Sequence, residues 1–203
     1  MTALGPRRPG RPRSESATSA VLAAAYRLSA GLGLRGTSMQ AIATESGVSK
    51  MTIYKWWPSR LHLLIDAYLR QATVLLPLSE SLPPLAAIRA HAVRYVAALQ
   101  GDLGRVQLAV LAECLAEHGN SELFVEHYLR IRRDLGVSVI RRGQRDGSIT
   151  TGRSAEVLYD QIYGAIFYRC QFGLKGLNRT FATSLVDAVL QPAAAARPGA
   201  EDR

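Results

Sequence analysis

Residues 37–57 read TSMQAIATESGVSKMTIYKWW, and their spacing is the main evidence for a fold class in this chain of 203 residues. Ala43 is followed by Gly47 four residues later and by Ile53 six residues after that glycine. A small residue is needed where two helices cross closely, and glycine allows the positive φ of a sharp turn. Val48 and Ile53 can fill the wedge between the helices. This is the spacing of a helix-turn-helix, although chance could also place these residues between two ordinary helices.

The second helix of this motif would leave a polar and cationic face exposed. The residues expected on that face are Ser49, Lys50, Met51, Thr52, Tyr54 and Lys55. Hydroxyl groups and positive charges together suit insertion into the major groove of double-stranded DNA. We therefore predict that this face binds DNA.

Helical periodicity continues on both sides of the motif. Apolar residues recur at helical spacing in segments 16–32, 37–46, 50–57, 59–76, 84–100, 103–117, 121–143, 153–173 and 178–191. Thr37 and Gln40 form a capping box, and Ser49 and Ser59 are suited to cap the two helices that follow. No segment alternates apolar and polar residues as a strand would, so we predict an all-α protein.

Prolines 77, 83 and 84 indicate a hinge between two helical regions. The predicted order is a flexible basic arm, an N-terminal domain, a C-terminal domain and a disordered tail, at residues 1–15, 16–76, 77–191 and 192–203.

The charge of the chain is concentrated near its N-terminus. Residues 1–60 hold nine Arg and Lys against two acidic residues, a net charge of +7, whereas residues 61–203 carry only +2. This asymmetry favours a polyanionic partner, and nucleic acid more than a membrane surface. With two cysteines, no long apolar run and no histidine pair at metal-binding spacing, we expect a reduced, cytoplasmic protein without disulfides, membrane contact, metal or cofactor.

Several short motifs around the helix-turn-helix share one register. They are GLGLRG at 31–36, TSMQAIA at 37–43, GVSK at 47–50, TIYKWWPSR at 52–60 and LL at 63–64. They lie within residues 16–76, and this segment of roughly 60 of the 203 residues resembles the DNA-binding domain of the TetR (tetracycline-repressor, AcrR-like) family of bacterial regulators. The resemblance implies a three-helix DNA-binding domain followed by a helical ligand-binding and dimerisation domain.

The resemblance also implies roles for individual residues in DNA binding. Thr37 and Ser38 correspond to phosphate anchors, and Tyr54 and Lys55 to strong phosphate contacts at the end of the recognition helix. Arg60 stands where the family usually has a phosphate-binding lysine.

The groove-facing positions implied by the resemblance are Ser49, Lys50 and Thr52. Met51 departs from the family, which usually has a small residue there, so this methionine either touches a thymine methyl group or crowds the groove. We expect Trp56 and Trp57 to brace the third helix rather than to stack on bases.

The arm contains a second candidate DNA contact. Pro9-Gly10-Arg11-Pro12-Arg13 resembles the core of an AT-hook, in which Arg11 and Arg13 would lie in a narrow minor groove. The alternative is a disordered basic tail that adds only non-specific affinity, and the short motif leaves both open.

The C-terminal region shows no catalytic constellation. Its arginines between 130 and 145 are interpreted as a solvated face paired with Glu126 and Asp134, in preference to an anionic-ligand site. Because this region has no strongly charged, apolar-flanked cluster other than the arginine run, we expect a small, largely hydrophobic effector. The residues that we expect to line its pocket are Leu111, Tyr128, Tyr163 and Phe167. The resemblance implies such a ligand-binding domain here. It further implies that the last two helices, at 158–190, form a four-helix bundle with a second copy.

These observations favour a homodimeric, ligand-responsive transcriptional regulator, more a repressor than an activator, that binds an inverted-repeat operator. One alternative is a constitutive DNA-binding protein with a vestigial pocket. Another is a small helical enzyme with an incidental helix-turn-helix, for which the sequence offers no catalytic group.

Overall fold

The computed structural model describes residues 14–191, and these residues form helices without any strand. The helices are α1 (Glu15–Gly36), α2 (Met39–Ser46), α3 (Lys50–Trp56), α4 (Arg60–Leu75), α5 (Pro84–Leu99), α6 (Asp102–His118), α7 (Glu122–Phe124), the π-helix η1 (Val125–Leu129), α8 (Arg130–Arg145), α9 (Ala155–Gln171) and α10 (Arg179–Leu190). The all-α prediction is confirmed. The predictions for the AT-hook-like segment, including Arg11 and Arg13, and for the tail at 192–203 lie outside the described residues.

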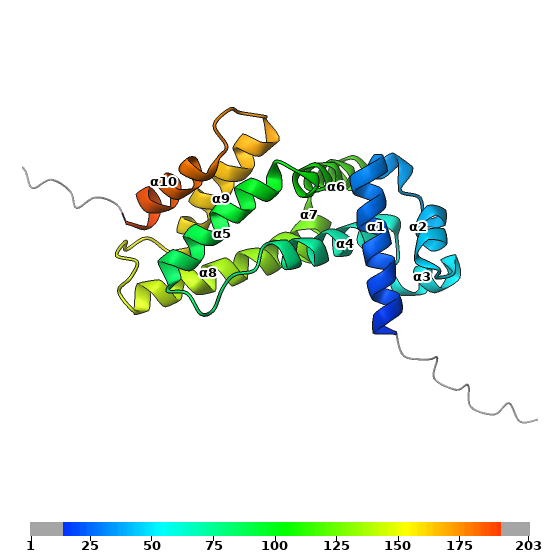
Figure 1. Ribbon diagram of the computed structural model, residues 1–203, viewed down its shortest axis with the longest axis horizontal. Helices are drawn as coiled ribbons and strands as arrows, with labels where there is room; N and C mark the ends of the chain where they lie inside the picture. Colours follow the sequence, from blue (N-terminus) through cyan, green and yellow to red (C-terminus); the bar gives the residue numbers. More distant parts are fainter. Residues whose placement is uncertain (1–13, 192–203) are drawn as a thin grey trace, which may run out of the picture.

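Helices α1, α2 and α3 lie at one end of an elongated molecule, and α9 and α10 lie toward the other end (Figure 1). α1 is longer than predicted, because only Gly33 leaves the helical region, with φ 69° and ψ 174°. The chain therefore kinks at this glycine and continues in helical geometry to Gly36. α1 packs against α2, α4 and α6, and buries Val21, Ala24 and Ala25.

The cap of α2 differs from the prediction by one residue. The Oγ of Ser38 accepts a hydrogen bond from the backbone N–H of Ala41 at 3.1 Å, so Ser38 is the N-cap and Thr37 is not. Thr37 is fully buried, and its hydroxyl donates to the carbonyl of Gly33 at 2.8 Å. The predicted caps at Ser49 and Ser59 are confirmed, because each accepts from a backbone N–H three residues later.

The turn between α2 and α3 is made by Gly47, whose φ of 69° lies in the left-handed region that side chains with a Cβ atom avoid. Ala43 and Ile53 are buried on either side of it, as the spacing predicts.

Helix α4 joins the two halves of the molecule. It buries Leu61, Leu64, Ile65 and Tyr68, and it packs against α1 on one side and against α6 and η1 on the other. A displacement of α4 would therefore change the helix packing in both halves.

The C-terminal half is built around α5 and α8. α5 packs against α10, α8 and α6, and α8 packs against α9. The predicted helix 121–143 is α7, η1 and α8 in direct succession, and it ends at Arg145. α8 and α9 approach closely at Gly136, where an added Cβ would lie 2.3 Å from the ring of Tyr159. No helix within residues 14–191 is both long enough and apolar enough to cross a membrane.

Candidate functional site

Helix α3 presents the face that the sequence predicts to bind DNA. Ile53 is fully buried, whereas Met51 is 83% exposed and Tyr54 is 51% exposed. Lys50 and Lys55 are also exposed, and Thr52 is half-buried. The Oγ of Ser49 accepts from the backbone N–H of Thr52 at 3.2 Å, which holds the start of this short helix. The exposed side chains are therefore displayed on a helix whose start and buried face are held in place.

Two of the residues predicted to contact phosphate have partners within the protein. Thr37 is fully buried, so in this conformation its hydroxyl cannot reach a phosphate, which corrects the prediction for this residue. The guanidinium of Arg60 donates to the carbonyl of Leu34 at 2.9 Å and forms an ion pair with Glu113 of α6. The phosphate contact of Arg60 stays a prediction, and Glu113 is a partner that the sequence did not indicate.

Trp57 fastens the end of α3 to α4. Its side chain is only 2% exposed, and its Nε1–H donates to Oδ2 of Asp66 at 2.8 Å. The ring of Trp56 meets that of Trp57 edge-on, with centroids 5.8 Å apart. These contacts agree with a bracing role for Trp57. They hold the end of α3 against α4.

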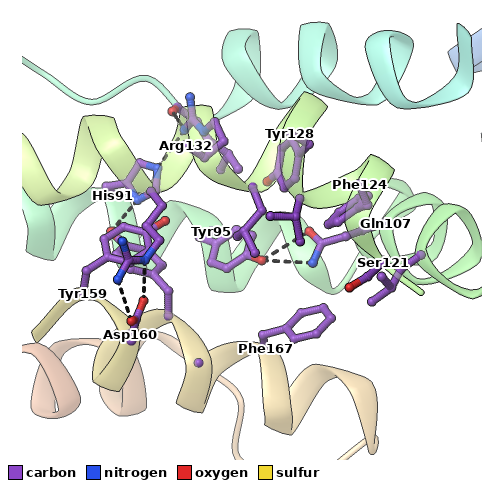
Figure 2. Close-up of a pocket in the computed structure, with 17 residues that line it drawn as sticks. His91, Tyr95, Gln107, Ser121, Phe124, Tyr128, Arg132, Tyr159, Asp160 and Phe167 are labelled. Carbon is purple, nitrogen blue, oxygen red and sulfur yellow. Dashed lines mark hydrogen bonds and ion pairs between the residues drawn. The ribbon is translucent and has the colours of Figure 1, made fainter. Parts of the chain in front are cut away.

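A cavity of about 550 Å³ lies in the C-terminal half, between α5, α6, η1, α8 and α9. All four residues that the sequence predicts for a ligand pocket line it, namely Leu111, Tyr128, Tyr163 and Phe167. Most of its wall is apolar or aromatic, and Figure 2 shows the side chains converging from several helices. This volume falls in the ordinary range for small-molecule sites.

One side of the cavity carries a polar cluster of three residues that we call the Arg132 cluster: His91, Arg132 and Tyr163. Nη2 of Arg132 lies 3.0 Å from Nε2 of His91, and Nδ1 of His91 lies 2.6 Å from the hydroxyl of Tyr163. A guanidinium can only donate, so Nε2 of His91 accepts and its Nδ1–H donates to Tyr163. His91 is therefore neutral. Burial and the nearby guanidinium groups lower the pKa of His91 to about 3, in agreement with this assignment.

Arg132 corrects the interpretation of the arginine run as a solvated face. Its side chain is buried, and Nη2 also donates to the carbonyl of Leu76. Arg133 lines the cavity as well, and it forms a two-pronged pair with Asp160 at 2.8 and 2.7 Å. The predicted pairing with Glu126 is found at Arg130, which is exposed.

A second polar network connects the cavity to α4. The hydroxyl of Tyr68 donates to Oε1 of Gln107, and Nε2 of Gln107 lies 3.1 Å from the hydroxyl of Tyr95. Burial raises the pKa values of Tyr68 and Tyr95 well above the ordinary range, so both hydroxyls stay protonated. Gln107 and Tyr95 line the cavity, whereas Tyr68 belongs to α4.

His91, Gln107 and Arg132 are not among the residues predicted from the sequence. A signal was present for the first two, because each is a polar residue on the otherwise apolar buried face of its helix. For Arg132 no such signal existed, since it is one of six arginines between 130 and 145, and the other five are exposed or half-buried.

Comparison with known proteins agrees with this architecture. The family described as "Bacterial regulatory proteins, tetR family" matches residues 21–67, and "Tetracyclin repressor-like, C-terminal domain" matches residues 85–189. The chain is 30% identical over 177 residues to the HTH-type transcriptional regulator YdeS of Bacillus subtilis, covering 87% of this chain and 89% of YdeS.

Solved structures with this fold include the TetR family transcription regulator SCO0332, at 26% identity and a TM-score of 0.77, covering 87% of this chain and 97% of that one. Bacillus subtilis FadR in complex with stearoyl-CoA is 16% identical, with a TM-score of 0.64 and coverage of 85% and 97%. At this identity, the similarity to FadR shows a shared fold and nothing about the ligand. With both halves of the chain matched in order, and a relative aligned over most of its length, the protein belongs to the TetR family of DNA-binding transcriptional regulators.

Proposed function

We propose that this protein is a cytoplasmic, homodimeric repressor that leaves an inverted-repeat operator when a small effector enters the cavity. The observation that carries the proposal is a hydrogen bond between the cavity and α4: the hydroxyl of Tyr68, in α4, donates to Gln107, which lines the cavity. A ligand that contacts Gln107 or Tyr95 would change the partners available to Tyr68. Such a switch requires the ligand to bind one conformation more tightly than the other.

The DNA end of α4 has a matching connection. Arg60, the first residue of α4, bridges the carbonyl of Leu34 in α1 and the carboxylate of Glu113 in α6. A shift of α4 driven from the cavity would therefore change how α1 to α3 are held. In a dimer, the same shift would alter the distance between the two recognition helices, and with it the fit to two half-sites.

The proposed dimer uses α9 and α10. Four large apolar side chains in and beside α9 are more than a third exposed: Val157, Tyr168, Phe172 and Leu174. Exposed apolar side chains favour association with another surface. A second copy pairing through α9 and α10 would join the two C-terminal halves and place the DNA-binding ends apart.

The effector class can be approached through the fold neighbour that was crystallised with stearoyl-CoA. Its ligand is a long-chain acyl thioester. Acyl-CoA thioesters therefore belong in a first screen for this chain, together with other largely apolar compounds that fit about 550 Å³.

The test begins with selection of binding sites from a random DNA pool by the purified protein. We expect an inverted repeat with half-sites roughly one helical turn (about 34–36 Å) or somewhat more apart, and a dimer at micromolar concentration in sedimentation. An asymmetric single-half-site footprint or a monomer would contradict the dimeric repressor.

Effector response is then measured by fluorescence anisotropy on that operator, with Tyr68→Phe as the test variant. Loss of the Tyr68 hydroxyl should leave operator affinity nearly unchanged and weaken release by any cavity ligand that acts on the wild type. If a broad set of cavity-sized compounds never released the DNA, the constitutive alternative would replace the proposal.

A further inference from the structure

The lining of the cavity carries one unmatched positive charge. Its charged residues are Arg132, Arg133 and Asp160. Arg133 and Asp160 neutralise each other through their two-pronged pair. His91 is neutral, so the guanidinium of Arg132 is the only charge of the lining without a counter-charge, and no carboxylate of residues 14–191 forms an ion pair with it.

Burial makes this unmatched charge unusual. Arg132 is only 6% exposed, and transfer of an isolated charge out of water is costly unless another charge compensates it. Its protein contacts are the carbonyl of Leu76 and Nε2 of His91, which are both neutral acceptors. They occupy Nη2 alone. Within the described chain, Nε and Nη1 of Arg132 therefore have no protein acceptor.

Tyr163 adds a second unused donor beside the guanidinium. Its oxygen accepts from His91, and its own hydroxyl hydrogen meets no acceptor among the described residues. Tyr163 lines the cavity, as Arg132 does. Figure 2 shows His91 and Arg132 toward one side of the cavity, and Phe124 and Phe167 toward the other. The site thus has a cationic, donor-rich side and an aromatic, apolar side.

We propose that the cavity binds an amphipathic carboxylic acid, with its carboxylate at Arg132 and Tyr163 and its apolar body against Phe124, Leu111 and Phe167. This inference rests on the proposed function only in taking the cavity as a ligand site. A carboxylate offers acceptors that match the fork of an arginine, and it supplies the missing counter-charge. The aromatic side provides the apolar contacts that a hydrocarbon body needs.

The experiment compares ligands that share a body and differ in the polar end. Decanoate, 1-decanol and decylammonium form one set, and 2-naphthoate with naphthalene-2-methanol forms a second set of different shape. Binding to the wild-type protein is measured by calorimetry. In at least one set the carboxylate should bind about 10- to 100-fold more tightly than the alcohol, the range of a charge-assisted hydrogen bond. Decylammonium should not bind measurably.

Variants of α8 identify the residue responsible. Arg132→Met should remove the preference for carboxylate over alcohol, while its affinity for the alcohol stays within about threefold of the wild-type value. Arg132→Lys keeps the positive charge and should retain part of the preference for carboxylate. Arg130→Met is the matched control, because Arg130 is an exposed arginine two residues away that does not line the cavity. It should leave the preference intact. If Arg132→Met does not fold, the wild-type comparison and the lysine variant still decide the question.

Equal affinity for carboxylate and alcohol, absence of carboxylate binding in both sets, or a preference that survives Arg132→Met would each overturn the proposal. Decanoyl-CoA provides a further arm, because the thioester lacks the free carboxylate. Tighter binding of decanoyl-CoA that does not depend on Arg132 would also overturn it.

DNA release is measured separately. A carboxylate that binds without releasing operator would contradict the repressor mechanism alone, whereas release by neutral ligands only would contradict the carboxylate assignment alone.

Discussion

His91 lies between Arg132 and Tyr163, and its contact with Arg132 requires the neutral form, because Nε2 must accept from the guanidinium. Burial first, and then the positive charges of Arg132 and Arg94, lower its pKa to about 3. The unfolded chain has an ordinary histidine pKa of about 6.5. Between these two values the unfolded state binds more protons than the folded state, so stability falls as the pH falls below about 6.5.

We predict that His91 accounts for a loss of about 2 kcal/mol in the free energy of unfolding between pH 7 and pH 5. His91→Gln should flatten this part of the profile, which urea titrations at several pH values would measure. His62 also has a lowered pKa and acts in the same direction, but it is present in both proteins. An unchanged slope in His91→Gln would show that His91 is not the group that titrates.

The exposed residues of α3 are predicted to divide into those that read bases and those that hold phosphates. Lys50→Ala or Thr52→Ala should cost about 1–3 kcal/mol at the operator and relax preference at one position per half-site. Lys55→Ala should instead weaken operator and scrambled duplexes alike, because phosphates are the same in both. Anisotropy titrations on the two duplexes test this. Equal losses on both duplexes for Lys50→Ala and Thr52→Ala would refute the groove-facing assignment.

Helices α8 and α9 depend on Gly136 for their close approach. An added Cβ would lie 2.3 Å from Cε2 of Tyr159, and that ring is itself stacked on Tyr163 with centroids 4.3 Å apart. The ring therefore has little freedom to move aside. The packing of these two helices also shapes the cavity, since Tyr159 and Tyr163 line it.

We predict that Gly136→Ala lowers the free energy of unfolding by about 1–3 kcal/mol, as overpacking of a well-packed site does. Gly31→Ala is the matched control, because an added Cβ in α1 meets no atom within 4 Å. It should be neutral or stabilise by up to about 1 kcal/mol through helix propensity. Chemical denaturation of the two variants provides the comparison, and equal midpoints would show that α8 and α9 can separate without cost.

Most of the net positive charge of the chain lies in its N-terminal third, and the remainder is nearly neutral. In a DNA-binding regulator this arrangement places most of the positive charge near the polyanion. Residues 1–13 contribute four arginines to it.

Deletion of residues 1–13 should therefore weaken specific and non-specific DNA binding together. It should also reduce the slope of log K against log salt by about 0.9 for each phosphate that the arm no longer neutralises. Titrations at several salt concentrations on operator and scrambled duplexes measure both effects. A weakening confined to A·T-rich operators would instead support minor-groove reading by Arg11 and Arg13.

Local patterns in the sequence were sufficient for the helices, for the helix-turn-helix and for the residues displayed on α3. Helical periodicity, caps such as Ser49 and a turn glycine such as Gly47 act over a few residues, so they can be recognised without knowing the rest of the fold. The same patterns placed Leu111, Tyr128, Tyr163 and Phe167 at the cavity, because apolar and aromatic faces of helices point inward.

The positions of the buried polar groups depend on which helices meet. Arg132 is one of several arginines in its helix, and only the packing of α8 against α5 brings it to His91. Its second acceptor, the carbonyl of Leu76, lies at the end of α4. Arg60 and Glu113, 53 residues apart, meet because α4 crosses α6. Such contacts join residues distant in the chain, and their energies depend on burial and on neighbouring charges, which no local pattern contains. The tertiary structure alone therefore reveals the unmatched charge in the cavity and the connection from the cavity to the DNA-binding end.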